Sequence, residues 1–277
     1  MLNLLYKISD DKKCVLVDKP VGVTPYQCVR HLADTHFPET KLGYAGRLDP
    51  MASGLLLLLV GDENKKKHKY EGLSKQYIVE ILLGISTDSQ DLLGVIKDTN
   101  MLKSSLQETL NETLLSFVGK HKMQYPVFSS KRVSGKPLFY HAREGSISRI
   151  EIPTKEIVIN KIEIIQKTKI TTKEIFEKAS AIIPKIDGKF RQAEIIDGWK
   201  YFFAQNDNQT YDLIKIKVNC ESGAFMRWLA EKIGKRLNTP ALAFSIRRTK
   251  IGSFGLNELG LDVTSAHAPA RTVSTHV

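Results

Sequence analysis

The stretch of sequence that decides the fold reads GYAGRLDPMASG over residues 43–54 and continues directly into LLLLLV over residues 55–60. The uninterrupted apolar run predicts a buried strand, and the glycines before it predict a loop that leads into that strand. Asp49 lies within the loop, and Pro50 restricts the backbone of the residue before it to extended dihedral angles. We therefore expect a carboxylate held in a fixed pose at the edge of a sheet. An aspartate that caps a turn is the interpretation that the local features alone favour.

The residues before this loop predict a strand, a turn and a helix. Residues 14–17 are typical of a short strand, which runs into the turn KPVG at residues 19–22. Thr24 is a typical helix N-cap, with Pro25 at the first helical position and Gln27 completing a capping box. The pattern predicts a helix over about residues 26–33.

The residues after the loop predict an interspersed set of helices and strands. Asp62 is expected to cap a short basic helix that ends near Gly72. Apolar spacing predicts helices over residues 104–117, with Ser104 or Ser105 as cap, and 225–237, and strands over residues 77–83, 157–165, 211–219 and 242–251. The order follows no strict βαβ rhythm, and neither GxGxxG nor GxxxxGK[ST] occurs. The sequence therefore predicts an α+β fold around a mixed, mainly antiparallel central sheet flanked by helices and loops.

Three segments depart from regular patterning. Residues 123–147 are aromatic, basic and without a clean period, which suits a long functional loop; we call them the clamp segment. Residues 168–210 are polar and predict an insertion with one helix over 173–183. Residues 255–277 predict a short C-terminal extension, largely a disordered tail. One domain over residues 1–254 is expected to hold the remaining elements.

Composition excludes several classes of protein. The chain has 277 residues, of which 42% are hydrophobic, and this fraction rules out a wholly disordered chain. The longest apolar run, residues 55–60, is far shorter than the roughly 18–20 residues of a membrane helix. The three cysteines form no CxxC pair, so neither a disulfide framework nor a zinc knuckle is supported. We expect a cytoplasmic protein without a metal site or a membrane partner.

The charge indicates a polyanionic partner. Lysine and arginine outnumber aspartate and glutamate by 41 to 30, giving a net charge of +11. The excess is clustered at residues 65–69, at 120–122, within the clamp segment, and between residues 232 and 250. One such cluster is usually a solvated helix face, but four clusters with a net excess favour RNA or DNA as the partner.

Four motifs, taken in order, resemble one enzyme family. The segment GRLDPMASG resembles the catalytic motif of pseudouridine synthases, whose invariant feature is an aspartate in this loop. KPVG at 19–22, KQY at 75–77 with LGISTDSQD at 83–91, and CESGAFMR at 220–227 with IRR at 246–248 are similar to the TruB-type branch. That branch isomerises uridine 55 in the T arm of tRNA. The resemblance covers roughly residues 15–254.

The resemblance implies a catalytic set of three residues. Asp49 matches the family's catalytic aspartate, Arg227 the arginine that pairs with it, and Tyr77 the tyrosine that stacks on the flipped base. The reaction breaks the C1′–N1 bond of uridine, rotates the uracil and rejoins it through C5, and it requires no metal and no cofactor. A bidentate guanidinium suits a fixed, partly desolvated carboxylate better than an ammonium does.

The resemblance also implies contacts to the RNA. The clamp segment matches the family's RNA-clamping thumb. Its residue types suit that role, because phosphates bind cations and unstacked bases pack on aromatic rings. The residues expected to bind substrate are Lys19, Tyr44, Arg47, Asp88, Lys131, Arg132, Lys136, Arg143, Phe225 and Ile246. Tyr44 stands where the family has histidine, and Arg47 replaces a small residue. We expect the residues after 254 to be too few for the family's usual C-terminal RNA-binding domain, and residues 168–210 are a candidate substitute for it.

Two alternatives to a tRNA pseudouridine synthase stay open. Arginine in GRLD is also similar to the ribosomal-RNA branches, so another RNA target is the nearest enzymatic competitor. A tRNA-binding chaperone without turnover is the competitor from a different class. The expected partner is the T arm of tRNA, and no obligatory protein partner is inferred.

Overall fold

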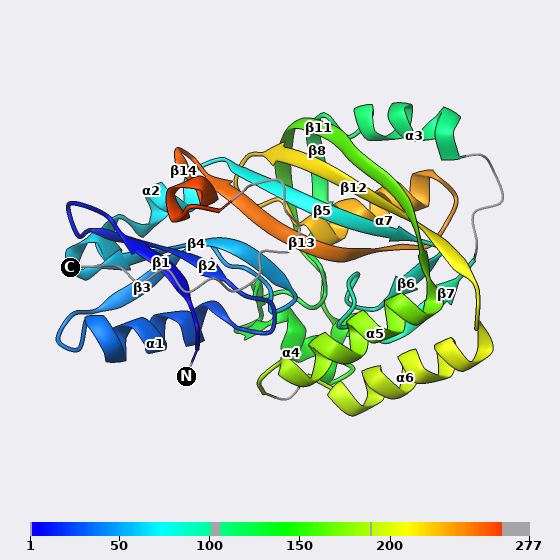
Figure 1. The fold of residues 1–277 in the computed structure, drawn as a ribbon, viewed down its shortest axis with the longest axis horizontal. Coiled ribbons are helices and arrows are strands. Elements are labelled where there is room, and N and C mark those ends of the chain that lie inside the picture. Colours follow the sequence, from blue (N-terminus) through cyan, green and yellow to red (C-terminus); the bar gives the residue numbers. More distant parts are fainter. Residues whose placement is uncertain (1, 101–105, 189, 262–277) are drawn as a thin grey trace. The chain divides into compact units, whose positions relative to one another are not determined.

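The computed structural model describes residues 2–100, 106–188 and 190–261 (Figure 1). These residues form two compact units, each built from separate stretches of chain. Of the described residues, the first unit takes 2–78, 185–188 and 246–261, and the second takes the remainder between 79 and 245. Two strands, β5 (Lys75–Leu83) and β13 (Ala241–Ile251), begin in one unit and end in the other.

The first unit is organised around β4 (Ala52–Val60), the strand predicted from the leucine run. It pairs in antiparallel register with β2 (Cys14–Lys19) and β3 (Leu42–Ala45), and in parallel with β13. The outer strands are β1 (Leu5–Ile8) beside β2 and β14 (Phe254–Gly255) beside β13. The central position of β4 explains why its sequence shows no polar alternation.

Both faces of β4 are covered by apolar side chains. Leu55, Leu57 and Leu59 belong to one core cluster, whereas Leu56 and Leu58 belong to another. All five are completely buried. Successive side chains of a strand point to opposite faces, so a run of leucines is what a strand buried on both faces requires.

The helix before the Asp49 loop begins as its capping signals predict. In α1 (Pro25–His36), the Thr24 hydroxyl accepts a hydrogen bond from the Gln27 amide, and the Gln27 side chain accepts one from the Thr24 amide. The short basic helix predicted to end near Gly72 is confirmed, but the prediction that Asp62 caps it was wrong. A 3₁₀ turn, η1 (Gly61–Lys66), begins at Gly61 and continues into α2 (Lys67–Gly72), while the Asp62 carboxylate pairs with Lys65 at 2.8 Å.

The second unit holds the strand order β13-β5-β12-β11-β8. Its antiparallel ladder is formed by β12 (Thr210–Cys220), β11 (Thr154–Thr171) and β8 (Gly119–Gln124). Two small hairpins accompany it, β6 (Ile85–Thr87) with β7 (Ile96–Thr99) and β9 (Arg132–Val133) with β10 (Lys136–Pro137). The predicted α+β class with a mainly antiparallel sheet is confirmed.

Five helices and two 3₁₀ turns complete the described part of the second unit. They are α3 (Leu106–Leu115), α4 (Leu138–Arg143), η2 (Ile147–Arg149), α5 (Thr172–Ile182), η3 (Ile183–Lys185, its last residue in the first unit), α6 (Gln192–Gln205) and α7 (Met226–Arg236). The clamp segment, expected to be a loop, therefore contains the β9–β10 hairpin and α4. The proposed caps Ser104 and Ser105 lie outside the described residues.

The segment predicted as an insertion is a helical hairpin. Figure 1 shows α5 and α6 side by side, and both pack into one core cluster with Leu82 and Phe244. The helix predicted over residues 173–183 is confirmed as α5, whereas α6 escaped prediction. Trp199 of α6 is buried, and its indole nitrogen donates to the Leu92 carbonyl at 3.2 Å. The hairpin is thus part of the core of this unit.

The C-terminal end of the described chain extends past the boundary expected from sequence. Residues 256–259 form a 3₁₀ turn, η4 (Leu256–Leu259), whose two leucines are buried in the first unit's core cluster. The rest of the predicted extension, residues 262–277, lies outside the described residues. No helix in the described ranges combines the length and the apolar character that crossing a membrane requires.

Candidate active site

The Asp49 loop is pinned by its backbone. The Asp49 carbonyl accepts a hydrogen bond from the Ala52 amide at 3.0 Å, and the Pro50 carbonyl accepts one from Gly22 at 2.8 Å. The second bond ties the loop to the KPVG turn. At the far end, Gly54 adopts a φ of +101°, and a Cβ on it would lie 2.2 Å from the Arg248 carbonyl oxygen. Only glycine fits where β4 passes this close to β13.

A buried arginine holds the loop from β13. Arg248 is 1% exposed; its Nε donates to the Leu55 carbonyl at 2.8 Å and its Nη1 to the Arg47 carbonyl at 3.1 Å. These two bonds bracket Asp49 in sequence. The third guanidinium nitrogen, Nη2, is buried and has no hydrogen-bond acceptor among the described residues. Arg248 therefore brings a fixed positive charge to the loop that carries the carboxylate.

Lys19 is a second buried cation of the same unit. Its ammonium group donates to the Pro20 and Val23 carbonyls at 2.8 and 2.7 Å, and the residue is completely buried. Burial, together with the nearby charge of Arg248, lowers the pKa of Lys19 to about 7, while the electrostatic interaction with the Asp49 carboxylate opposes the shift. Its predicted substrate contact stays a prediction; the bonds themselves hold the KPVG turn.

Arg247, the neighbour of Arg248 on β13, makes a separate ion pair. Its Nη2 lies 3.0 Å from the Asp18 carboxylate, and its Nη1 lies 3.4 Å from the Ser53 hydroxyl. Successive strand residues point to opposite faces, so the two arginines serve different neighbours. Sequence reasoning quoted this arginine pair as a motif without assigning either residue to the site.

Arg227 is held in the second unit by partners that include Ser89, Phe128 and Asp91. It is 2% exposed; its Nη1 donates to the Ser89 carbonyl at 2.8 Å and its Nη2 to the Phe128 carbonyl at 3.1 Å. Its Nε lies 3.6 Å from the Asp91 carboxylate. The guanidinium is therefore fixed between the β6–β7 connection and the clamp segment. Asp49 belongs to the first unit, and its pairing with Arg227 stays a prediction.

Asp91, rather than Asp88, is the acidic partner of Arg227 in this connection. The Asp91 carboxylate also accepts hydrogen bonds from the Ser89 hydroxyl at 2.5 Å and the Leu93 amide at 2.9 Å. Asp88 instead accepts from the Val95 amide at 2.9 Å and from Arg191 at 2.8 Å. The sequence signal that could have indicated Asp91 as a site residue is its place in the same motif as Asp88, directly before the apolar Leu92.

The remaining predicted residues divide between the units. Tyr77 on β5 and Ile246 on β13 are buried in the first unit. Arg47 is exposed there, and the Lys67 ammonium lies 5.2 Å from the ring centre of Tyr44. Phe225 directly precedes α7 in the second unit, and its ring centre lies 5.9 Å from the Arg227 guanidinium.

The clamp segment presents cations over aromatic rings. Lys131 lies 5.2 Å from the ring centre of Tyr125, and Lys136 lies 4.6 Å from that of Tyr140 and 3.5 Å from Glu144. The Lys131, Arg132, Lys136 and Arg143 side chains are all exposed. Exposed cations beside rings suit both phosphates and unstacked bases.

The lysine block after β4 has a different character. Lys65, Lys66 and Lys67 form ion pairs with Asp62, Glu63 and Glu71 at 2.8, 3.1 and 3.5 Å. These local pairs neutralise much of the charge that the sequence shows. The block is a solvated surface whose ion pairs contribute little to stability.

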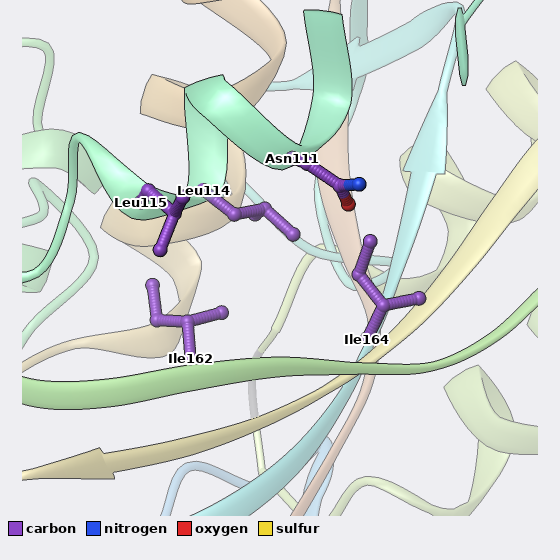
Figure 2. Close-up of a pocket in the computed structure, with 5 residues that line it drawn as sticks. All are labelled: Asn111, Leu114, Leu115, Ile162 and Ile164. Atoms are coloured by element: carbon purple, nitrogen blue, oxygen red, sulfur yellow. The ribbon is translucent and has the colours of Figure 1, made fainter. Parts of the chain in front are cut away.

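An apolar groove lies elsewhere in the second unit. It has a volume of about 280 Å³ and lies between α3 and β11. Its lining consists of Asn111, Leu114, Leu115, Ile162 and Ile164 (Figure 2). Because none of these side chains is an acid, a base or a cation, the groove does not supply the chemistry. Among the described residues, no group of three or more His, Cys, Asp or Glu side chains is placed to hold a metal ion.

The mixed sheet, with the Asp49 loop before its central strand, agrees with the pseudouridine synthase class that the sequence motifs indicate. A solved Cbf5-Nop10-Gar1 complex shares the fold with a TM-score of 0.53 at 18% identity, over 87% of this chain and 49% of that one. The family model for TruB family pseudouridylate synthases (N-terminal domain) matches residues 34–181. The chain belongs to the TruB family.

Curated relatives agree with this assignment. The protein named tRNA pseudouridine synthase B of Caldicellulosiruptor saccharolyticus is 31% identical over 242 residues, covering 87% of this chain and 68% of its own. Its namesake in Flavobacterium johnsoniae is 29% identical, covering 90% of this chain and 92% of its own. The one in Bacillus subtilis is 29% identical, with coverages of 95% and 72%.

Proposed function

We propose that this protein isomerises uridine to pseudouridine in tRNA, at position 55 of the T arm. The observation that carries the proposal is the Asp49 loop, fixed by Arg248 and by the KPVG turn in a chain of the TruB family. The relatives named tRNA pseudouridine synthase B support tRNA as the substrate. A tRNA substrate supports a cytoplasmic location, which we propose for the reaction.

Asp49 is the reacting carboxylate in this proposal. It acts on the sugar or the base while the C1′–N1 bond breaks, and the uracil then rejoins through C5, so no atom is gained or lost. Extruding the base from the T loop costs a few kcal/mol, which contacts with the flipped nucleotide must offset. Tyr77 packs against that base, and Arg227 keeps the carboxylate ionised and oriented.

The clamp segment provides the RNA contacts. Its exposed cations bind phosphates without reading sequence, and its rings receive bases that have left the stack. The buried cations Lys19 and Arg248 hold the loop through hydrogen bonds to backbone carbonyls, whether or not Lys19 also contacts the substrate as predicted. Recognition and chemistry are thereby assigned to different residues.

The test maps the product on two RNAs. An unmodified tRNA transcript and ribosomal-RNA fragments are each incubated with the protein, and pseudouridine is located by chemical derivatisation and primer extension. We expect a single stop one nucleotide 3′ of position 55, which maps the product to that position of the tRNA. A product in ribosomal RNA alone would favour the competitor suggested by Arg47, which is exposed at the start of the loop.

Asp49→Asn separates catalysis from tRNA folding. The variant is expected to bind tRNA without modifying it, whereas Asp62→Asn, an exposed acid outside the loop, should remain active. If the parent leaves tRNA unmodified while both proteins promote tRNA folding, the enzyme proposal is wrong and a chaperone is favoured.

A further inference from the structure

We propose that the connection between α5 and α6 positions the clamp segment before RNA arrives, with Arg191 as the positioning residue. The proposal rests on the RNA-binding role given to the clamp segment above. The relevant contacts are made by Phe190 and Arg191, the residues directly before α6. They lie in a segment that the catalytic motifs do not include.

Arg191 begins α6 in an unusual conformation. Its φ and ψ are 58° and 32°, a left-handed geometry that residues with a side chain rarely adopt. Its carbonyl accepts the hydrogen bond of the Ile195 amide at 3.0 Å and so starts the helix. This geometry fixes the direction in which the side chain leaves the backbone.

The Arg191 side chain connects two functional segments. Its Nη1 donates to the Asp88 carboxylate at 2.8 Å, and its guanidinium lies 4.7 Å from the ring centre of Phe128. The Phe128 carbonyl in turn accepts a hydrogen bond from Arg227 at 3.1 Å. Phe128, near the start of the clamp segment, is therefore contacted by Arg191 at its ring and by Arg227 at its backbone carbonyl.

The preceding residue holds the other end of the clamp segment. The Phe190 ring centre lies 4.9 Å from the guanidinium of Arg143, the last residue of α4. The same guanidinium also lies 5.2 Å from the ring centre of Phe139. Burial, and then the nearby charge of Arg191, lower the pKa of Arg143. Phe190 and Arg191 together thus contact both Phe128 and Arg143.

Residues 185–188 of the same connection belong to the first unit and make their contacts there. Gln27 of α1 donates to the Asp187 carboxylate at 3.1 Å. Lys185 packs against the KPVG turn so closely that a Cβ added to Gly22 would lie 3.0 Å from the Lys185 Cβ.

Hydrogen exchange without RNA measures the positioning directly. In Arg191→Ala we expect amides of residues 131–146 to exchange about tenfold faster than in the parent, because an ion pair and a cation–π contact are lost. Phe190→Ala should accelerate the same amides. Arg191→Lys keeps the charge opposite Asp88 and should recover part of the protection. Lys200→Ala is the matched control, since it removes an exposed cation from the same helix.

Steady-state kinetics complete the test. We expect Arg191→Ala to raise the KM for tRNA by about two- to fivefold with little change in kcat, because a smaller fraction of the enzyme has its clamp in place. Unchanged exchange in both Arg191→Ala and Phe190→Ala would overturn the positioning role, whatever the activity. A parent that forms no pseudouridine would count against the proposed function alone, because the exchange experiment contains no RNA.

Discussion

The Asp49 loop and the clamp segment both gather positive charge, and they do so in opposite ways. In the first, Lys19 and Arg248 are buried, and backbone carbonyls accept their hydrogen bonds. In the second, Lys131 and Lys136 are exposed and lie over aromatic rings. A buried cation with fixed partners holds geometry, whereas an exposed one remains available to a phosphate. Changes in the first region should therefore affect turnover or folding, and changes in the second should affect affinity and its salt dependence.

The largest expected effect is the loss of turnover in Asp49→Asn. The substitution keeps the shape of the side chain and removes the charge, so kcat should fall by about a thousandfold or more, as for other residues that react with substrate. The Kd for tRNA should stay within about threefold of the parent, because phosphate contacts elsewhere supply most of the affinity. Single-turnover kinetics with a filter-binding assay measures both quantities.

Asp62→Asn gives the comparison a matched control. Asp62 is an exposed acid of the same unit, paired with Lys65 on the surface. Its kcat and Kd should equal those of the parent. If Asp49→Asn lowered affinity and turnover by the same factor, the loop would be contributing to binding, and the contrast between the two regions would disappear.

The next largest effect is on stability, in Gly54→Ala. Alanine is strained at a φ of +101°, and its Cβ would meet the Arg248 carbonyl at 2.2 Å. We expect the free energy of unfolding to fall by about 3 kcal/mol or more, since backbone strain and overpacking add. Chemical denaturation measures the change, and Gly72→Ala is the control because nothing lies within 4 Å of a Cβ at Gly72. An equal effect of both substitutions would contradict the close approach of β4 and β13.

The first unit shows which structural features the sequence alone could predict. The leucine run predicts a strand buried on both faces because periodicity is a local property, and the capping residues Thr24 and Gln27 predict the start of α1 for the same reason. The loop with Asp49 was recognisable because its glycines and proline restrict their own backbone. Local chemistry was sufficient for these features.

The features that escaped prediction depend on contacts between distant residues. Arg248 holds the carbonyl of Arg47, which is far away in sequence, and nothing in its own neighbourhood distinguishes it from Arg247. Asp91 and Asp88 stand in one motif, and only their partners Arg227 and Arg191 separate their roles. Helix α6 was hidden because its sequence includes Gly198, a weak helix former, although packing on α5 supports the helix. Tertiary contacts thus override weak local propensity.

The pH dependence of the free energy of unfolding should show an effect of intermediate size that is due to Lys19. Its pKa is lowered to about 7 in the folded protein, below the usual value near 10.4 in an unfolded chain. Between these values the unfolded state binds more protons, so the contribution of Lys19 to stability improves as pH rises above 7. The difference in unfolding free energy between the parent and Lys19→Met should grow by about 1.4 kcal/mol per pH unit between pH 8 and 10.

Denaturation at several pH values checks this directly. The difference between the two proteins should be flat below about pH 6, where lysine is protonated in both states. A difference that stayed flat up to pH 10 would mean that the Lys19 ammonium is not desolvated. The contrast between buried cations in the Asp49 loop and exposed cations in the clamp segment would then not hold for Lys19. Lys65→Met, which removes an exposed lysine, should show no such slope.

The smallest effects belong to the clamp segment. If six or more phosphates are contacted, tRNA affinity of the parent should fall on the order of a thousandfold from 50 to 200 mM salt. Lys131→Ala should reduce the slope of log K against log salt concentration by about 1, with kcat unchanged. Lys65→Ala, whose charge is already paired with Asp62, should leave the slope as it is.

Lys136 provides the finest distinction. Its ammonium lies 3.5 Å from the Glu144 carboxylate and 4.6 Å from the ring centre of Tyr140, so a phosphate must compete with an existing partner. Lys136→Ala should therefore change the salt slope less than Lys131→Ala, and Glu144→Gln should increase the affinity for tRNA by about twofold. Equal slopes for the two lysine variants would show that the Glu144 contact is lost to solvent. The clamp segment would then act through its charge alone, without the local order that distinguishes one lysine from the other.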